Sequence, residues 1–116
     1  MSPIYSFAGI MPDIHESAFV GPTAAIIGSA TLAKNASAFY GVSVRADTAA
    51  ISVGAGTNLQ DYVVHHADPG YACTLGDRIS VGHSAVVHGC TAEDDCLNGM
   101  SGLNHHEAGP ASGQLY

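Results

Sequence analysis

Four histidines lie close together in the middle of the sequence, at His65, His66, His83 and His88, within a stretch that runs from 60 to 90. Neutral imidazole is the commonest protein ligand for zinc-type ions, and this density of imidazoles indicates a metal site. The spacing matches neither a zinc finger nor the helical H-E-x-x-H motif. The fold must therefore bring the ligands together.

The composition is that of a small acidic protein. The chain has 116 residues, with Lys+Arg 3 against Asp+Glu 10 and a formal net charge of −7, which suits one domain with a modest core. So acidic a chain is repelled by phosphate backbones and anionic membranes, so we expect no nucleic-acid or membrane partner. The N-terminus resembles neither a signal peptide nor a membrane span. The three cysteines, Cys73, Cys90 and Cys96, lack a disulfide-framework spacing, and we expect them to be small buried thiols. These features favour the cytoplasm.

Aliphatic residues recur every six positions from Val20 onward. With one three-residue and one four-residue insertion, the anchors of this repeat are Val20, Ile26, Leu32, Ala38, Val44, Val53, Leu59, His65, Leu75, Val81 and Val87. A period of six fits neither an α-helix nor a plain alternating strand. So short a repeat is typical of a solenoid, in which each unit buries its apolar side against its neighbours.

The repeat predicts an all-β fold, a left-handed parallel β-helix in which three hexapeptides close one triangular coil. Such a fold is an exception to the usual right-handed crossover, and its alternative is a glycine-rich β-sandwich. We expect residues 1–17 to cover one end, residues 18–100 to form the β-helix and residues 101–116 to be an irregular tail. The hexapeptides weaken after Val87, so the β-helix is expected to be shortened at the C-terminus, its open edge covered by the tail or by subunit contacts.

The insertions fix which residues share a face of the prism. Arg45, His66 and His88 each follow an anchor by one residue and are one coil apart. They should therefore stack on one face, with backbones about 4.8 Å apart. Asp61 and His83 each follow an anchor by two residues, which places them on a different face. His66 and His88 can thus hold one ion together, whereas His83 points elsewhere.

Three neutral imidazoles that leave a fourth position for water are the layout of a catalytic zinc site. A threefold assembly completes this set, because each interface sets one subunit's His66/His88 face against the neighbour's His83. His65 leaves an alternative open. As an inward anchor its polar ring needs a partner, and a one-residue shift would turn it outward in place of His66.

At these residues the sequence resembles the γ-class carbonic anhydrase-like family of left-handed β-helix proteins. The matching stretches are FYGVSVRAD (39–47), TNLQDYVVHHADPGY (57–71) and LGDRISVGHSAVVHGC (75–90), with a weaker match at 96–100. The resemblance implies that the metal ligands are His66, His83 and His88. This agrees with the set obtained from the repeat.

The resemblance also implies roles for four further residues. Arg45 and Asp47 match the family's R-G-D, an ion pair at the subunit interface. Gln60 and Asp61 match its Q-D pair, in which the glutamine orients metal-bound water and the aspartate supports the interface. The implied protein is a homotrimer with zinc, or alternatively iron or cobalt, at each interface. Its reaction is the reversible hydration of CO2 to bicarbonate by hydroxide held on the ion.

The sequence also departs from the family at several positions. Thr48 and the short loop 67–71 stand where well-studied members carry proton-transfer glutamates, so proton release should limit turnover. Ala46 replaces the glycine of R-G-D, which would be strained if its φ were positive. Two alternatives follow: a metal-binding trimeric scaffold without catalysis, and a hexapeptide-repeat acyltransferase or thioesterase, which would need one active-site histidine and no metal.

Overall fold

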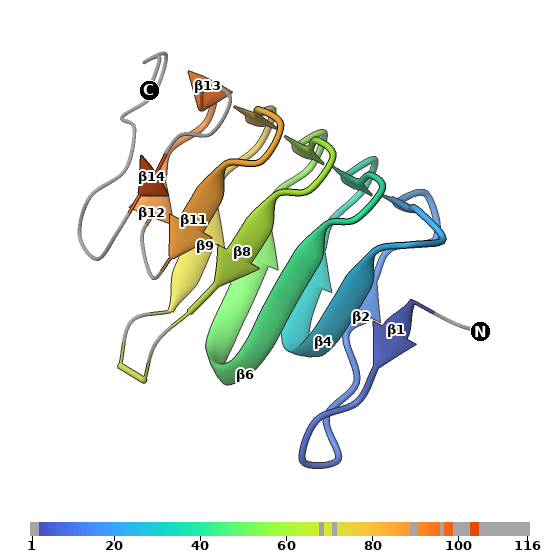
Figure 1. Cartoon of the computed structure of the whole chain (residues 1–116). Helices are drawn as coiled ribbons and strands as arrows, with labels where there is room; N and C mark the ends of the chain where they lie inside the picture. The colour runs from blue at the N-terminus through green and yellow to red at the C-terminus, as the bar shows by residue number, and fades with distance from the viewer. Residues whose placement is uncertain are drawn as a thin grey trace.

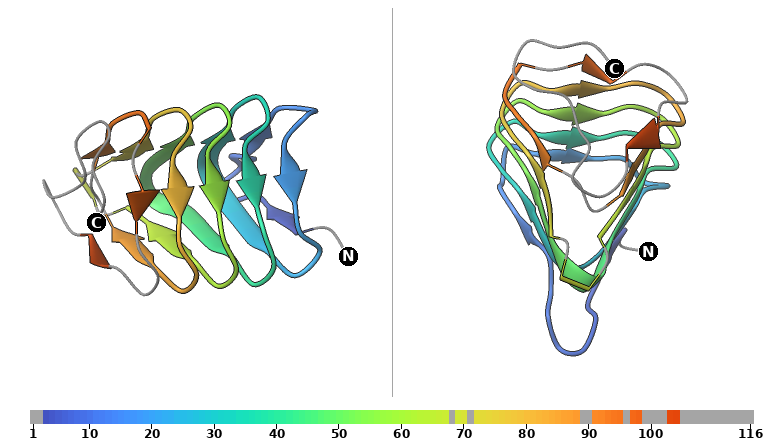
Figure 2. Two further views of the ribbon diagram at one scale, coloured as in Figure 1. Left: turned by 90° about the horizontal axis from the view of Figure 1, so that it is seen from above. Right: turned by 90° about the vertical axis from the view of Figure 1, so that its left-hand side faces the viewer.

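The chain winds into a three-sided solenoid of parallel strands, seen end-on as a triangle in Figure 2. The computed structural model describes residues 3–67, 69–70, 72–88, 91–95, 97–98 and 103–104. Every strand in this part of the chain pairs in parallel with strands of the neighbouring coils. The predicted left-handed parallel β-helix is confirmed. Over the same residues, no helix is long and apolar enough to cross a membrane.

Each face of the prism is a ladder of short strands (Figure 1). The first face consists of β1 (Ile4–Tyr5), the first halves of β4 (Ala25–Leu32) and β6 (Ser43–Val53), β8 (Val64–His66), β11 (Val86–His88) and β14 (Leu103–Asn104). The second consists of β2 (Asp13–Ile14), the second halves of β4 and β6, β9 (Cys73–Leu75) and β12 (Thr91–Ala92). The third consists of β3 (Phe19–Val20), β5 (Ser37–Ala38), β7 (Asn58–Leu59), β10 (Ser80–Val81) and β13 (Leu97–Asn98).

The register of these ladders follows the hexapeptide repeat. On the first face Ile26, Val44, His65 and Val87 lie one above another. Val20 is half-buried, and the other anchors are buried: Ile26, Leu32, Ala38, Val44, Val53, Leu59, His65, Leu75, Val81 and Val87. Because the anchors of successive coils stack, the core is a continuous column of aliphatic side chains inside the prism.

Two buried polar side chains interrupt this column in the described part of the chain, Thr57 and His65. The hydroxyl of Thr57 donates to the carbonyl of Gly76 at 2.6 Å and accepts from the amide of Ile79 at 3.1 Å. Both hydrogen-bonding functions of this hydroxyl are therefore satisfied. His65 has a different environment, described with the candidate site.

Strand pairing extends past both boundaries expected for the β-helix. β1 and β2 lie within 1–17 and pair with β4, and β14 lies within 101–116 and pairs with β11. Leu75 pairs with Ala92, so the ladder continues where the hexapeptide pattern weakens. The rest of the tail, including its proposed capping role, lies outside the described residues.

The strain considered for Ala46 is absent. Ala46 does not have positive φ, whereas its ladder partner Gly28 has φ 77°. A β-carbon added to Gly28 would collide with the carbonyl oxygen of Ala46. The position that requires glycine at this corner is therefore Gly28, one coil before position 46, where the resemblance placed a glycine.

Candidate metal centre

The imidazoles of His66 and His88 stack on the first face of the prism. β8 pairs with β11 so that His66 lies opposite His88, and the ring centroids are 4.9 Å apart with an interplanar angle of 29°. Arg45 lies opposite His66 on the other side, in β6. The predicted column of Arg45, His66 and His88 is therefore present.

Arg45 and Asp47 surround the outer nitrogen of His66. Arg45 Nη2 lies 3.1 Å and Asp47 Oδ1 lies 3.3 Å from His66 Nε2, and Arg45 Nε lies 3.2 Å from Asp47 Oδ2. A guanidinium only donates and a carboxylate only accepts, so a neutral Nε2 can serve one of them at a time. Within one chain, the predicted Arg45–Asp47 ion pair thus restrains the ring of His66.

His83 and Asp61 lie at the corner between the third and first faces, away from the stacked pair. His83 is exposed. Asp61 Oδ1 accepts from the amide of Tyr40 at 3.3 Å, and its carbonyl accepts from the amide of Ser84 at 3.0 Å. Asp61 therefore ties together the turns of three successive coils, including the turn that carries His83.

Gln60 precedes this corner and is half-buried. Its Nε2 donates to Asn58 Oδ1 at 2.5 Å, and its backbone amide donates to the carbonyl of Val81 at 3.0 Å. The side-chain amide is therefore directed along the third face by Asn58, next to the corner that carries His83.

The described residues contain no group of three or more His, Cys, Asp or Glu side chains that could hold a metal ion. One chain brings together two of the three expected ligands, His66 and His88, and leaves His83 apart. The donor chemistry fits a zinc-type ion, which prefers imidazole nitrogen, and the pair supplies half of a tetrahedral set. The described residues of one chain do not supply the rest of the coordination.

His65 points into the prism. Its side chain is fully buried, its Nε2 lies 3.0 Å from Cys73 Sγ, and its Nδ1 has no partner in the described part of the chain. Burial, and secondly repulsion from His66, lower the pKa of His65 to about 3, so the ring is neutral at physiological pH. The alternative in which His65 faces outward is therefore excluded.

The partner of His65 was missed from the sequence, although a signal was present. Cys73 was predicted only as a buried thiol. It stands two residues before the inward anchor Leu75, so strand alternation places its side chain inside the prism as well.

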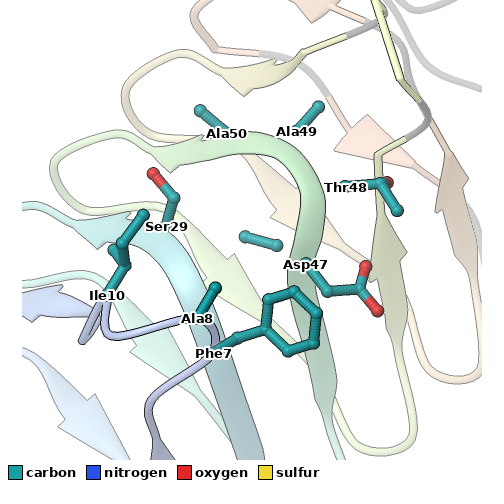
Figure 3. A pocket seen from close by; sticks show the side chains of 9 residues that line it. Phe7, Ala8, Ile10, Ser29, Asp47, Thr48, Ala49 and Ala50 are labelled. Carbon is teal, nitrogen blue, oxygen red and sulfur yellow. The ribbon is translucent and has the colours of Figure 1, made fainter.

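A pocket of about 210 Å³ adjoins Asp47 at the corner between the first and second faces (Figure 3). It is lined by residues of the turn after β1 and of the neighbouring corners: Phe7, Ala8, Ile10, Ser29, Ala46, Asp47, Thr48, Ala49 and Ala50. Thr48 Oγ1 donates to the carbonyl of Ala67 at 2.5 Å. Thr48 is therefore tied to the backbone, and its hydroxyl does not ionise near neutral pH.

Comparisons with known proteins place the chain in a family. The protein-family models that were searched give no match. The chain is 44% identical over 95 residues to Gamma carbonic anhydrase 2, mitochondrial, of Arabidopsis thaliana, covering 77% of this chain and 34% of the relative. It is 38% identical over 88 residues to a Methanocaldococcus jannaschii protein named as a probable carbonic anhydrase, covering 76% of this chain and 55% of the relative.

The fold has its own close match among solved structures. A hexapeptide transferase family protein of Anaplasma phagocytophilum superimposes with a TM-score of 0.83 at 30% identity, covering 97% of this chain and 76% of the other. The chain thus spans about a third of the length of the plant relative and about half of the archaeal one. On this sequence identity and this shared fold, the chain belongs to the γ-class carbonic anhydrase-like family of hexapeptide-repeat, left-handed β-helix proteins.

Proposed function

We propose that this chain is the subunit of a metal-dependent, carbonic anhydrase-like homotrimer that catalyses the reversible hydration of CO2 to bicarbonate. The supporting observation is the stack of His66 on His88, two imidazoles in register on one outer face. The names of the relatives support the reaction. Zinc is the ion that this donor set suits best, and iron or cobalt are the alternatives.

The ligands would come from two subunits. His66 and His88 of one subunit would face His83 of its neighbour, because His83 is exposed at a corner of its own chain. A bound ion of this kind lowers the pKa of a coordinated water toward about 7 and so supplies hydroxide at neutral pH. Metal binding would also be coupled to assembly, since each subunit would supply only part of the ligand set.

The remaining residues of this chain would orient the ligands and the water. Arg45 and Asp47 restrain the ring of His66 through their contacts with Nε2. Asp61 holds the turn that carries His83 through the amide of Ser84. Gln60, next to this corner, would hydrogen-bond the attacking water and fix its orientation.

A second candidate function is a metal-binding scaffold without catalysis. It is favoured by Thr48, whose hydroxyl is bound to the carbonyl of Ala67 where a proton-transfer carboxylate would be needed. In the catalytic proposal this feature makes proton release to buffer the slow step. Both functions require the same metal site and differ in turnover.

Metal analysis with molar-mass determination tests the site. Wild type should be a trimer with one ion per interface, and H66A, H88A and H83A should each lose most of the metal. The matched control is H15A, because His15 is exposed and its Nδ1 contacts Ser17 in its own turn. Metal retained in all three ligand variants would refute the site.

A stopped-flow assay of CO2 hydration then separates the enzyme from the scaffold. Turnover that disappears in H66A but persists in H15A supports the enzyme, and metal binding without turnover supports the scaffold. A metal-free trimer that transfers an acyl group from coenzyme A would instead support the transferase alternative.

A further inference from the structure

Strand β8 differs from its neighbours β6 and β11 because residues 63–66 place the same residue types on both sides of the strand. Val63 and His65 are buried inside the prism, whereas Val64 and His66 lie on the outer side. If the strand turned over, Val64 and His66 would replace Val63 and His65 inside the prism, so the residue types there would stay the same.

Hydrophobicity determines the side in the neighbouring coils. In β6 Val44 is buried and Arg45 is exposed, and in β11 Val87 is buried while His88 lies outside. A one-residue slip there would bury a charged or polar group in place of an aliphatic one. Within β8 itself the slip carries no such difference, so the orientation depends on the buried Ala67 after the strand, whose place Asp68 would take, and on the specific contacts of His65.

The specific interaction inside the prism is the contact between His65 and Cys73. Nε2 and Sγ are 3.0 Å apart, and both side chains are fully buried. Nδ1 of His65 has no partner in the part of the chain that the structure describes, so the contact with the thiol satisfies one of the two ring nitrogens, Nε2. Without the thiol, both ring nitrogens would be buried and unsatisfied, which is costly in an apolar core.

We propose that Cys73 is a positioning residue for the metal centre. Its thiol holds His65 inside the prism and thereby presents His66, rather than His65, beside His88. Cys73 lies on the second face and His66 on the first, so the contact acts across the core. The inference rests on the proposed function for its consequence at the metal, but the orientation of β8 can be tested in metal-free protein.

The test compares three variants with wild type. C73V removes the hydrogen-bonding group and stays apolar. The matched control I51V trims the residue that pairs with Cys73 one coil earlier, so it loosens the same column without touching the thiol. The double variant H65V/C73V replaces the polar pair by two aliphatic side chains and restores the difference between the two sides of β8.

The main measurement is carbethoxylation of histidines by diethyl pyrocarbonate in metal-free protein, followed by tandem mass spectrometry. In wild type and I51V, His66 should react and His65 should be protected. In C73V, the reaction of His65 should be faster by at least about tenfold. Zinc affinity should fall about 10–100-fold in C73V, the range found when a supporting partner of a ligand is lost. It should return to within about threefold of wild type in H65V/C73V.

Protection of His65 in C73V equal to that in wild type would overturn the proposal. If C73V does not fold, recovery of folding in H65V/C73V supports it and lack of recovery contradicts it. If His65 becomes exposed in C73V but wild type binds no metal, the positioning role is supported and the metal site is refuted. If wild type binds metal, and C73V loses it while His65 stays protected, the metal site is supported and the positioning role is refuted.

Discussion

His65 and His66 are consecutive in the sequence and lie on opposite sides of one strand. His65 is 0% exposed, whereas the side chain of His66 is 17% exposed and is grouped with Arg45 and Asp47. Strand alternation alone produces this separation. Its consequence is that one imidazole is buried and uncharged, while its neighbour lies on the outer side of the strand beside His88.

The burial of His65 predicts an acid-sensitive fold. Its pKa is about 3 when folded and 6.5 when exposed, so between these values the unfolded chain binds more protons than the folded one. The contribution of His65 to the free energy of unfolding is therefore fully present above pH 6.5. It is lost as the pH falls toward 3, at about 1.4 kcal/mol per pH unit. From pH 7 to pH 5 we expect the free energy of unfolding to fall by about 2 kcal/mol through this group.

Urea unfolding of metal-free wild type and H65V at pH 7 and pH 5, at equal concentration, measures this contribution. The loss of stability on acidification should be smaller in H65V by the amount above. Equal losses in the two proteins would show that His65 does not carry the effect.

Gly28 and Gly9 give a matched pair of backbone variants, since both have positive φ, 77° and 80°. G9A meets no atom within 4 Å and should destabilise by about 1–2 kcal/mol, the cost of the left-handed conformation. In G28A the new β-carbon also collides with the carbonyl oxygen of Ala46. We expect a further loss of about 1–3 kcal/mol from this overpacking. Equal urea midpoints for the two variants would contradict this account of the corner.

A carboxylate at position 48 should restore proton transfer. Thr48 is exposed beside Asp47 at the pocket, and T48E would place an ionisable group there at the loss of the hydrogen bond to Ala67. If proton release limits turnover, T48E should raise the CO2 hydration rate in dilute buffer by several-fold, with less effect in concentrated buffer. T48Q is the control, because it has the same shape and cannot carry a proton. Equal rates for T48E and T48Q in dilute buffer would exclude proton release as the slow step.

The hexapeptide repeat predicted the fold in detail because it reports directly on packing. Anchors that must bury an aliphatic group every six residues fixed the three faces, the insertions and the column of Arg45, His66 and His88. The separation of His83 from this column followed from the same count. A local, periodic signal of this kind can be recognised from the sequence without knowledge of long-range contacts.

Features without a periodic signal were not predicted. β1 and β2 have two residues each and carry no hexapeptide, so their pairing with β4 depends on contacts far along the chain. The His65–Cys73 contact joins two faces across the core, and the two residues were predicted to be buried but not to be partners. The cytoplasmic location, the trimer and the ligand roles of the three histidines remain predictions.

The division of the metal site between subunits can be tested by mixing variants. If the proposed site is right, H66A and H83A would each destroy every site in a trimer of one kind. In trimers refolded from an equal mixture, some interfaces take His66 and His88 from an H83A subunit and His83 from an H66A subunit. Random assembly makes about a quarter of all interfaces intact in this way.

Metal content of the refolded mixture, compared with each variant refolded alone, is therefore the most direct measurement of the central claim. We predict that each variant alone binds almost no zinc and that the mixture recovers about a quarter of the wild-type content. A mixture that stays as metal-free as its components, although it forms mixed trimers, would contradict a site shared between subunits.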